Sequence, residues 1–259
     1  MPFIYTTNRR SFLKKSFVLS SASVFTTMLS ANSALASQDN EEGENFTFLF
    51  QGDSITDGNR TRNNDWNHVM GHGYQYIISS KLWYDLPEKH FHFYNRGVSG
   101  NKVTDLQQRW DADTLALKPD LLSILIGVND LDAWMNDNTK FTTADYEASY
   151  YGLLKQTINA LPSVQLVLCE PFILPVGKVK DKWAIYNDEI KKRQDVVTRL
   201  SVEFNAIHVP FQQVFNDALK RAPADYWIWD GIHPMPAGHE LLALEWMKQV
   251  GKKLKFIRT

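Results

Sequence analysis

Short apolar runs that alternate with longer stretches of helical character constrain the fold of this chain more than any other feature. Five such runs read as strands, at residues 46–50, 90–94, 121–126, 164–168 and 206–209. Parallel strands are joined by crossover connections, which are usually helices. The alternation therefore predicts an α/β fold with a five-stranded parallel sheet covered by helices on both faces.

The ends of three helices can be predicted from capping residues. Thr142 or Thr143 can cap a helix over residues 144–160, because a threonine hydroxyl accepts from the free amides of the first turn. A second helix is expected over 183–204, and a third over about 236–253, where it would close the chain.

The first 36 residues have the character of an export leader. Residues 8–15, NRRSFLKK, form a twin-arginine signature, and an Ala-Leu-Ala triplet at 34–36 resembles a cleavage site. The apolar stretch between them is rich in serine and threonine and short for a membrane anchor, which needs roughly 20 apolar residues. We therefore expect cleavage after Ala36, a periplasmic or extracellular protein, and no stable membrane insertion of the mature chain.

The remaining 223 residues suit a flexible start over 37–44 and a single domain over 45–259. Without the four basic residues of the leader, the count is 24 basic against 29 acidic residues, a net charge of -5. This balance, without a basic stripe, argues against a nucleic-acid partner. Cys169 is the only cysteine, so no intramolecular disulfide is possible, and its apolar surroundings predict a buried strand residue.

Four polar segments fall at the ends of the predicted strands or before the last helix. They are residues 52–58 (GDSITDG), 95–101 (NRGVSGN), 127–130 (GVND) and 230–234 (DGIHP). Ligands of open parallel sheets bind outside the carboxyl ends of the strands. The four segments are therefore expected to converge on one edge of the sheet.

Together these segments contain the groups that acyl transfer requires. Ser54 is the candidate nucleophile, His233 the base that takes its proton, and Asp230 the group that orients the imidazole. The backbone amides of Ser54 and Gly100 and the side-chain amide of Asn129 are candidate donors to the developing oxyanion. Catalytic residues are thus predicted at Ser54, Asp230 and His233.

In the order and spacing of these blocks the chain resembles the SGNH-hydrolase superfamily, the GDSL-like serine esterases and lipases, and within it the carbohydrate acetylesterases. The resemblance implies a three-layer, flavodoxin-like α/β/α fold and ester hydrolysis without a metal or a cofactor. It places the nucleophile at Ser54, and Ile55 stands conservatively where the family name has leucine. The second block is ambiguous because Gly97 lies near Gly100, although alignment on Asn95 favours Gly100.

Other interpretations of these segments are structural. Each one alone could be a turn or a helix cap, and the four gain weight only in combination. An ordinary α/β-hydrolase would need a Gly-x-Ser-x-Gly elbow, whereas Ser54 is followed by Ile-Thr-Asp. His68 and His72 have the spacing of a metal pair, but the flanking glycines argue against a rigid helix, and His239 is expected at the exposed start of the last helix.

Aromatic residues are the best clue to the substrate. Tryptophans 66, 110, 134, 183, 227 and 229 lie in or near predicted loops, and an aromatic platform suits a sugar ring. Trp134 and Trp229 are expected to line the pocket because they lie close to Asn129 and Asp230. The irregular stretch 171–182 could form one wall, and its three lysines are either solvated or able to favour an anionic group.

The expected function is therefore an exported serine esterase that deacetylates carbohydrate or another small ester. A lysophospholipase or thioesterase with the same machinery is the main alternative. An alternative of another class is a carbohydrate-binding protein on a hydrolase fold, although a pure binder has no need of an activated serine. The sequence carries no signal for an oligomeric state.

Overall fold

A computed structural model describes residues 43–63 and 65–257 of the chain. Its centre is one parallel sheet of five short strands, β1 (Thr47–Gly52), β2 (His92–Asn95), β3 (Leu121–Leu125), β4 (Gln165–Cys169) and β5 (Ile207–Val209). All four neighbouring pairs are parallel, in the order β2-β1-β3-β4-β5. The predicted five-stranded parallel sheet is confirmed, and each strand lies within about two residues of its predicted run.

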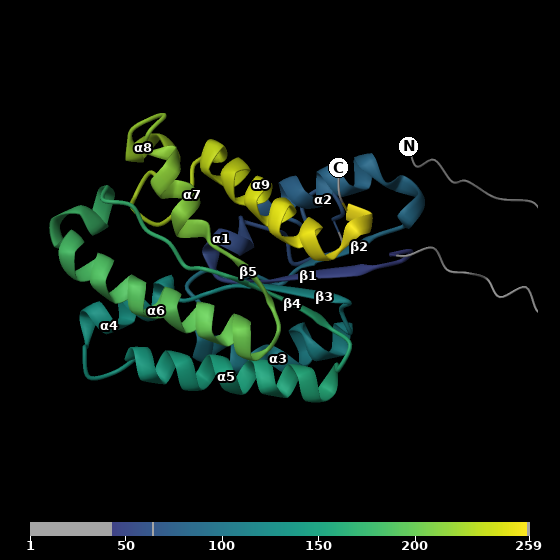
Figure 1. Ribbon diagram of the computed structural model, residues 1–259, viewed down its shortest axis with the longest axis horizontal. Coiled ribbons are helices and arrows are strands. Elements are labelled where there is room, and N and C mark those ends of the chain that lie inside the picture. Colours follow the sequence, from purple (N-terminus) through teal and green to yellow (C-terminus); the bar gives the residue numbers. More distant parts are fainter. Residues whose placement is uncertain (1–42, 64, 258–259) are drawn as a thin grey trace, which may run out of the picture. The chain divides into compact units, whose positions relative to one another are not determined.

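Helices cover both faces of this sheet, as Figure 1 shows. One layer contains α2 (Tyr74–Asp85), α7 (Phe211–Ala218), α8 (Ala224–Trp227) and α9 (Pro236–Lys253). The other contains α3 (Val103–Asp113), α4 (Val128–Asn136), α5 (Thr143–Ala160) and α6 (Trp183–Glu203). A four-residue helix, α1 (Ser54–Asp57), follows β1 directly.

Alternation along the central strand β1 builds two cores. Phe48 and Phe50 point to the core beneath α2, α7 and α9, whereas Leu49 between them joins the core beneath α3, α5 and α6. All three side chains are fully buried. Because a strand buried on both faces carries apolar side chains toward both, residues 48–50 of β1 form a continuous apolar run.

The three predicted helices are confirmed almost to the residue. Thr142 caps α5 through a capping box: its hydroxyl accepts from the Asp145 amide, and the Asp145 carboxylate accepts from the Thr142 amide. Such a cap stabilises a helix by about 1 kcal/mol. Cys169 ends β4 as a buried free thiol, as expected.

The predicted leader over 1–36 and most of the flexible segment 37–44 lie outside the described residues. Within the described part of the chain, no helix is long and apolar enough to cross a membrane.

Candidate active site

Ser54 lies where the topology of the sheet opens a crevice. From β1 the chain crosses to β2 on one side, and β3 pairs with β1 on the other, so the ends of β1 and β3 form a switch point. Asp53 caps α1 by accepting the Ile55 amide at 3.0 Å. This places half-buried Ser54 in the first turn of α1, with its hydroxyl directed to His233.

A tight loop before α9 carries the aspartate and the histidine. The Trp229 amide donates to the His233 carbonyl oxygen at 3.2 Å, which closes the loop. Asp230 Oδ1 accepts two backbone amides, from Ile232 at 3.0 Å and from His233 at 2.7 Å. These two amides therefore fix the position of the carboxylate independently of its contact with the imidazole.

Ser54, His233 and Asp230 form a continuous hydrogen-bonded chain. Ser54 Oγ lies 2.8 Å from His233 Nε2, and His233 Nδ1 lies 2.7 Å from Asp230 Oδ2. Burial alone would raise the pKa of the Asp230 carboxyl, but hydrogen bonds from the amides of His233 and Ile232 and from the imidazole hold this pKa below its usual value. An ionised carboxylate only accepts, so Nδ1 carries the proton and Nε2 accepts from the Ser54 hydroxyl.

The segment 171–182 packs directly against this loop. The Leu174 amide donates to the Gly231 carbonyl at 3.0 Å, and the Lys178 amide donates to the Asp230 carbonyl at 3.1 Å. At Gly177, whose φ is +53°, a Cβ would lie 2.4 Å from backbone atoms of Asp230. The sequence predicted a wall of the site here, and the structure shows a brace that fixes the Asp230 backbone.

Donors for an oxyanion lie on three different segments. No described residue accepts the backbone amide of Ser54 or of Gly100. The Asn129 amide group donates one hydrogen to the Asn101 carbonyl at 3.1 Å, which fixes its direction and leaves its second hydrogen for a ligand. At Gly100, with φ +83°, a Cβ would meet nothing within 4 Å, so the side of the loop on which a side chain would project is open.

The ambiguity between Gly97 and Gly100 is resolved by the partners of their amides. The Gly97 amide donates to Asn95 Oδ1 at 2.9 Å and is not free for a ligand. Asn95 is itself buried, and its Nδ2 donates to the carbonyls of Thr56 and Met70 at 2.7 and 3.0 Å. Gly100 is thus the available donor, and Asn95 positions the loop that carries it.

The buried carboxylate of Asp57 pairs with the half-exposed Arg62 and joins the Ser54 segment to the loop that carries Gly100, and our sequence reasoning missed this pair. Burial raises the pKa of the Asp57 carboxyl, but Arg62 and the amide and hydroxyl of Ser99 bring it below its usual value. Arg62 contacts both carboxylate oxygens, at 2.9 and 2.6 Å, and the Ser99 amide donates at 3.1 Å. The Asp-x-x-x-x-Arg spacing after Ser54 was the available signal.

Two further buried carboxyl groups, Asp53 and Asp130, lie behind the site without a paired cation. Burial and, to a smaller extent, the nearby Asp130 charge raise the pKa of Asp53 to about 7 against the hydrogen bond from the Ile55 amide. Burial likewise raises the pKa of Asp130 to about 6, against hydrogen bonding from the Val103 amide. These carboxyl groups cap backbone amides rather than pairing with arginine or lysine.

The predicted substrate-binding tryptophans lie in different environments. Trp229 is 62% exposed, and its indole lies 6.3 Å from the His233 ring at an interplanar angle of 27°, so it borders the loop of Asp230 and His233. Trp134 is partly buried in α4 and lines a surface cavity with Lys182 and Ile185. Its role in substrate binding stays a prediction.

Two expectations about aromatic and histidine side chains were wrong. Trp110 is fully buried in α3, where its indole donates to the Thr157 hydroxyl at 3.0 Å. His239 is buried rather than exposed: its Nδ1 accepts from the Tyr74 amide at 3.1 Å, and burial lowers its pKa to about 4. Trp110 and His239 both point inward because α3 and α9 pack against the sheet on these sides. The polarity of a single residue does not reveal which side of a helix is buried.

The remaining polar candidates have local partners. His68 lies in a turn and pairs with Asp65, and Lys178 pairs with Asp132 rather than facing an unoccupied anion site. Across residues 43–63 and 65–257, no group of three or more histidine, cysteine or acidic side chains is arranged to hold a metal ion.

Comparisons with known proteins agree with this geometry. Residues 50–241 match the model of the GDSL-like lipase/acylhydrolase family. The acetylxylan esterase of Geobacillus stearothermophilus is 33% identical over 217 residues, which cover 81% of this chain and 95% of that enzyme. Its crystal structure aligns with a TM-score of 0.72, over 81% of this chain and 96% of that chain.

A second solved structure, from Parabacteroides merdae and described as a GDSL-like lipase, is 42% identical with a TM-score of 0.77. It matches 81% of this chain and 97% of that chain. The Geobacillus enzyme has also been solved as catalytic mutants with a serine, an aspartate or a histidine replaced by alanine, and its aspartate and histidine are three positions apart. By its sequence and its fold, this carboxylic ester hydrolase belongs to the GDSL-like lipase/acylhydrolase family.

Proposed function

We propose that this protein is an exported serine esterase that removes acetyl groups from carbohydrate through Ser54, His233 and Asp230. The observation that carries the proposal is the hydrogen-bonded chain with distances of 2.8 and 2.7 Å between these three side chains. The three-residue spacing of Asp230 and His233, which the catalytic aspartate and histidine of the Geobacillus enzyme share, supports the same roles.

In the first half of the reaction, Ser54 Oγ attacks the carbonyl carbon of the acetyl ester while His233 Nε2 takes the hydroxyl proton. The amides of Ser54 and Gly100 and the side chain of Asn129 donate to the oxyanion that forms. When the tetrahedral intermediate collapses, His233 gives its proton to the sugar oxygen. The sugar leaves as an alcohol, and an acetyl group remains on Ser54.

In the second half, water takes the place of the sugar. His233 removes a proton from this water, which attacks the acetyl carbonyl. When the second intermediate collapses, the imidazolium of His233 gives its proton to Ser54 Oγ and acetate leaves. Throughout, the Asp230 carboxylate stabilises the imidazolium that forms twice per turnover. Every step uses groups of the chain and water alone.

A carbohydrate substrate is supported by two observations. The Geobacillus relative is named for acetylxylan, and another structure of it is described as an acetyl-xylooligosaccharide esterase. In this chain, the exposed indole of Trp229 lies beside His233, where an aromatic face can pack against a sugar ring. Export follows from the predicted leader over 1–36 and would place the enzyme where polymeric glycans are found.

A panel of esters tests the substrate. We expect hydrolysis of p-nitrophenyl esters to be fastest for acetate and to fall as the acyl chain lengthens, and we expect acetate release from acetylated xylo-oligosaccharides. Preference for long-chain esters or lysolipids, with no acetate released from any glycan, would favour a lysophospholipase or thioesterase instead. Detection of the mature N-terminus near residue 37 in a periplasmic or culture fraction tests export separately.

A further inference from the structure

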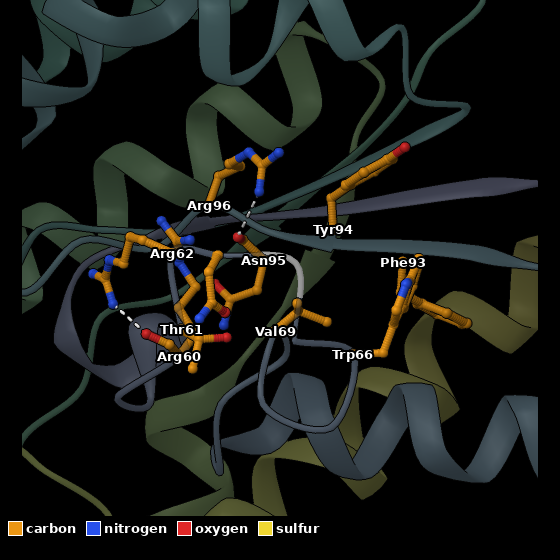
Figure 2. Close-up of a pocket in the computed structure, with 10 residues that line it drawn as sticks. Arg60, Thr61, Arg62, Trp66, Val69, Phe93, Tyr94, Asn95 and Arg96 are labelled. Atoms are coloured by element: carbon orange, nitrogen blue, oxygen red, sulfur yellow. Dashed lines mark hydrogen bonds between the residues drawn. The ribbon is translucent and has the colours of Figure 1, made fainter. Parts of the chain in front are cut away.

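A cavity that Ser54 does not line lies along the edge strand β2. Its volume is about 350 Å³, and its walls come from β2 and the connection between α1 and α2. Figure 2 shows guanidinium groups toward one side of this cavity and aromatic rings toward the other. The lining residues that matter are Arg60, Arg62, Arg96, Trp66 and Tyr94.

Two of the three arginines already have partners. Arg62 is bound to both oxygens of Asp57. Arg96 lies 3.8 Å from Asp113 and 5.4 Å from the centre of the Tyr94 ring. These two side chains therefore contribute positive potential to the cavity, but their charges are balanced by neighbours.

Arg60 is different because no carboxylate among the described residues forms an ion pair with its guanidinium, although the charges of Asp57 and Asp113 lie near enough to act on it. Its Nε donates to the Gly97 carbonyl at 3.0 Å, and no described side chain accepts from its two terminal nitrogens. The residue is only 9% exposed, and burial, with the charges of Arg62 and Arg96, lowers its pKa to about 10 against the opposing effect of Asp57 and Asp113. Arg60 thus remains protonated at neutral pH, and a largely buried cation without a direct ion pair is a good partner for a ligand carboxylate, which offsets the cost of burying the charge.

Trp66 supplies a surface of a different kind on the same cavity. Its side chain is 74% exposed, and no hydrogen bond or ring contact within the described residues accounts for its position. A flat indole beside a fork of guanidinium donors suits a ligand that carries both a ring and a planar anion. Among the parts of a glycan, a uronic acid residue has this combination.

We propose that this cavity is a subsite for the carboxylate of an acidic sugar, with Arg60 binding the carboxylate and Trp66 packing against the sugar ring. The inference rests on the proposed carbohydrate esterase function and deepens it, because it makes acetylated glycans with uronic acid substituents the favoured substrates. The same Arg60 holds Gly97, three residues before Gly100. The subsite therefore borders the loop that carries an oxyanion donor.

Direct binding tests the subsite without any catalysis. Titration calorimetry should show that methyl glucuronoside binds the full chain at least about tenfold more tightly than methyl glucoside, since a bidentate arginine contact distinguishes them. Arg60→Gln should abolish this difference. Arg199→Gln is the matched control, because Arg199 pairs with Glu147 between α5 and α6, on exposed surface.

Trp66→Ala keeps the test decisive if Arg60→Gln does not fold, since an exposed indole can be removed without opening the core. This variant should bind methyl glucuronoside several-fold more weakly. Equal affinity for the two glycosides would overturn the proposal. So would inorganic sulfate that binds as tightly as the glucuronoside and is unaffected by Trp66→Ala, because that result shows a general anion site with no sugar specificity.

Kinetics separates this inference from the proposed function. The ratio of kcat/KM for acetylated oligosaccharides with and without a uronic acid substituent should exceed one in the wild type and in Arg199→Gln, and should decrease several-fold toward one in Trp66→Ala. A ratio of one in the wild type would overturn the subsite while leaving the esterase intact. If no acetylated oligosaccharide were deacetylated, the proposed function would fail, and calorimetry would still decide the subsite.

Discussion

His233 lies between two oxygen atoms, one of which accepts a hydrogen bond from its ring while the other donates one to it. Asp230 requires a proton on Nδ1, and Ser54 requires a lone pair on Nε2. The amides of Ile232 and His233 occupy the other carboxylate oxygen, so only one oxygen of Asp230 is available to the ring. The tautomer needed for a general base therefore follows from the hydrogen bonds of one short loop.

We predict that Asp230→Asn keeps the fold but lowers kcat by roughly 10⁴-fold, as the equivalent change does in serine proteases. An asparagine can direct its amide at Nδ1, which reverses the tautomer and leaves Nε2 without a lone pair. Steady-state hydrolysis of p-nitrophenyl acetate measures the loss. Asp225→Asn, at an exposed position of α8, should retain wild-type kcat; a comparable loss in both variants, or in neither, would contradict the role of Asp230.

The residues that sequence reasoning found and those it missed differ in a physical way. Ser54, Asp230 and His233 stand in short motifs whose spacing already fixes their neighbours. Asn95 and Arg60 act through contacts between segments distant in sequence, which become visible only when the strands are placed side by side. His239 was misjudged for the same reason, because the amide of Tyr74, which it binds, is 165 positions away.

Among the elements, the 3-10 helix over Gly177–Lys182 has the closest connection to catalysis. It approaches the Asp230 backbone so tightly that only a glycine fits at position 177, and its backbone φ of +53° is also unfavourable for other residues. The sequence predicted only an irregular stretch here. Neither hydrophobic periodicity nor capping residues indicate that a segment will pack against a distant loop.

We predict that Gly177→Ala lowers both stability and kcat, because its Cβ must displace the loop that carries Asp230 and His233. The expected destabilisation is about 1–3 kcal/mol. Gly152→Ala is the matched control: it lies on the exposed face of α5, where the nearest atom to a new Cβ is 3.9 Å away. That control should stabilise the protein by about 0.5–1 kcal/mol and leave kcat unchanged.

Thermal unfolding and p-nitrophenyl acetate hydrolysis measure both variants. Wild-type kcat in Gly177→Ala would show that the brace does not position the catalytic loop.

For the molecule as a whole, most of the fold was predictable because a doubly covered parallel sheet is encoded in local apolar runs. The order β2-β1-β3-β4-β5 and the assignment of each helix to a face were not predicted from the residues, because local apolar runs do not show which strands are neighbours. Helix α2 was not predicted with defined ends, since it has no side-chain cap and no clear apolar stripe. Tertiary packing against α9 determines its position instead.

The buried carboxyl of Asp53 should make global stability depend on pH. Its pKa is raised from 3.8 to about 7 in the folded protein, so the folded state binds the proton more tightly than the unfolded state. The stability that this gives is fully present below about pH 4 and is lost as pH rises through 7. His239 contributes with the opposite sign, because its lowered pKa of about 4 removes stability as pH falls below 6.5.

We therefore predict that Asp53→Asn gains stability over the wild type as pH rises from 4 to 7, by an amount on the order of 4 kcal/mol. Asparagine still accepts the Ile55 amide and removes only the charge. The contribution of His239 is the same in both proteins and cancels in the difference. Chemical denaturation at several pH values measures the difference in free energy of unfolding between the variant and the wild type. If this difference did not change with pH, Asp53 would have the same pKa in the folded and unfolded states.

The central claim is that Ser54 is the nucleophile, and kcat/KM of Ser54→Ala on p-nitrophenyl acetate tests it most directly. We predict a loss of at least about 10⁴-fold, with unchanged thermal stability. Ser80→Ala, at an exposed position of α2, should match the wild type. Activity of Ser54→Ala within tenfold of the wild type would contradict the account.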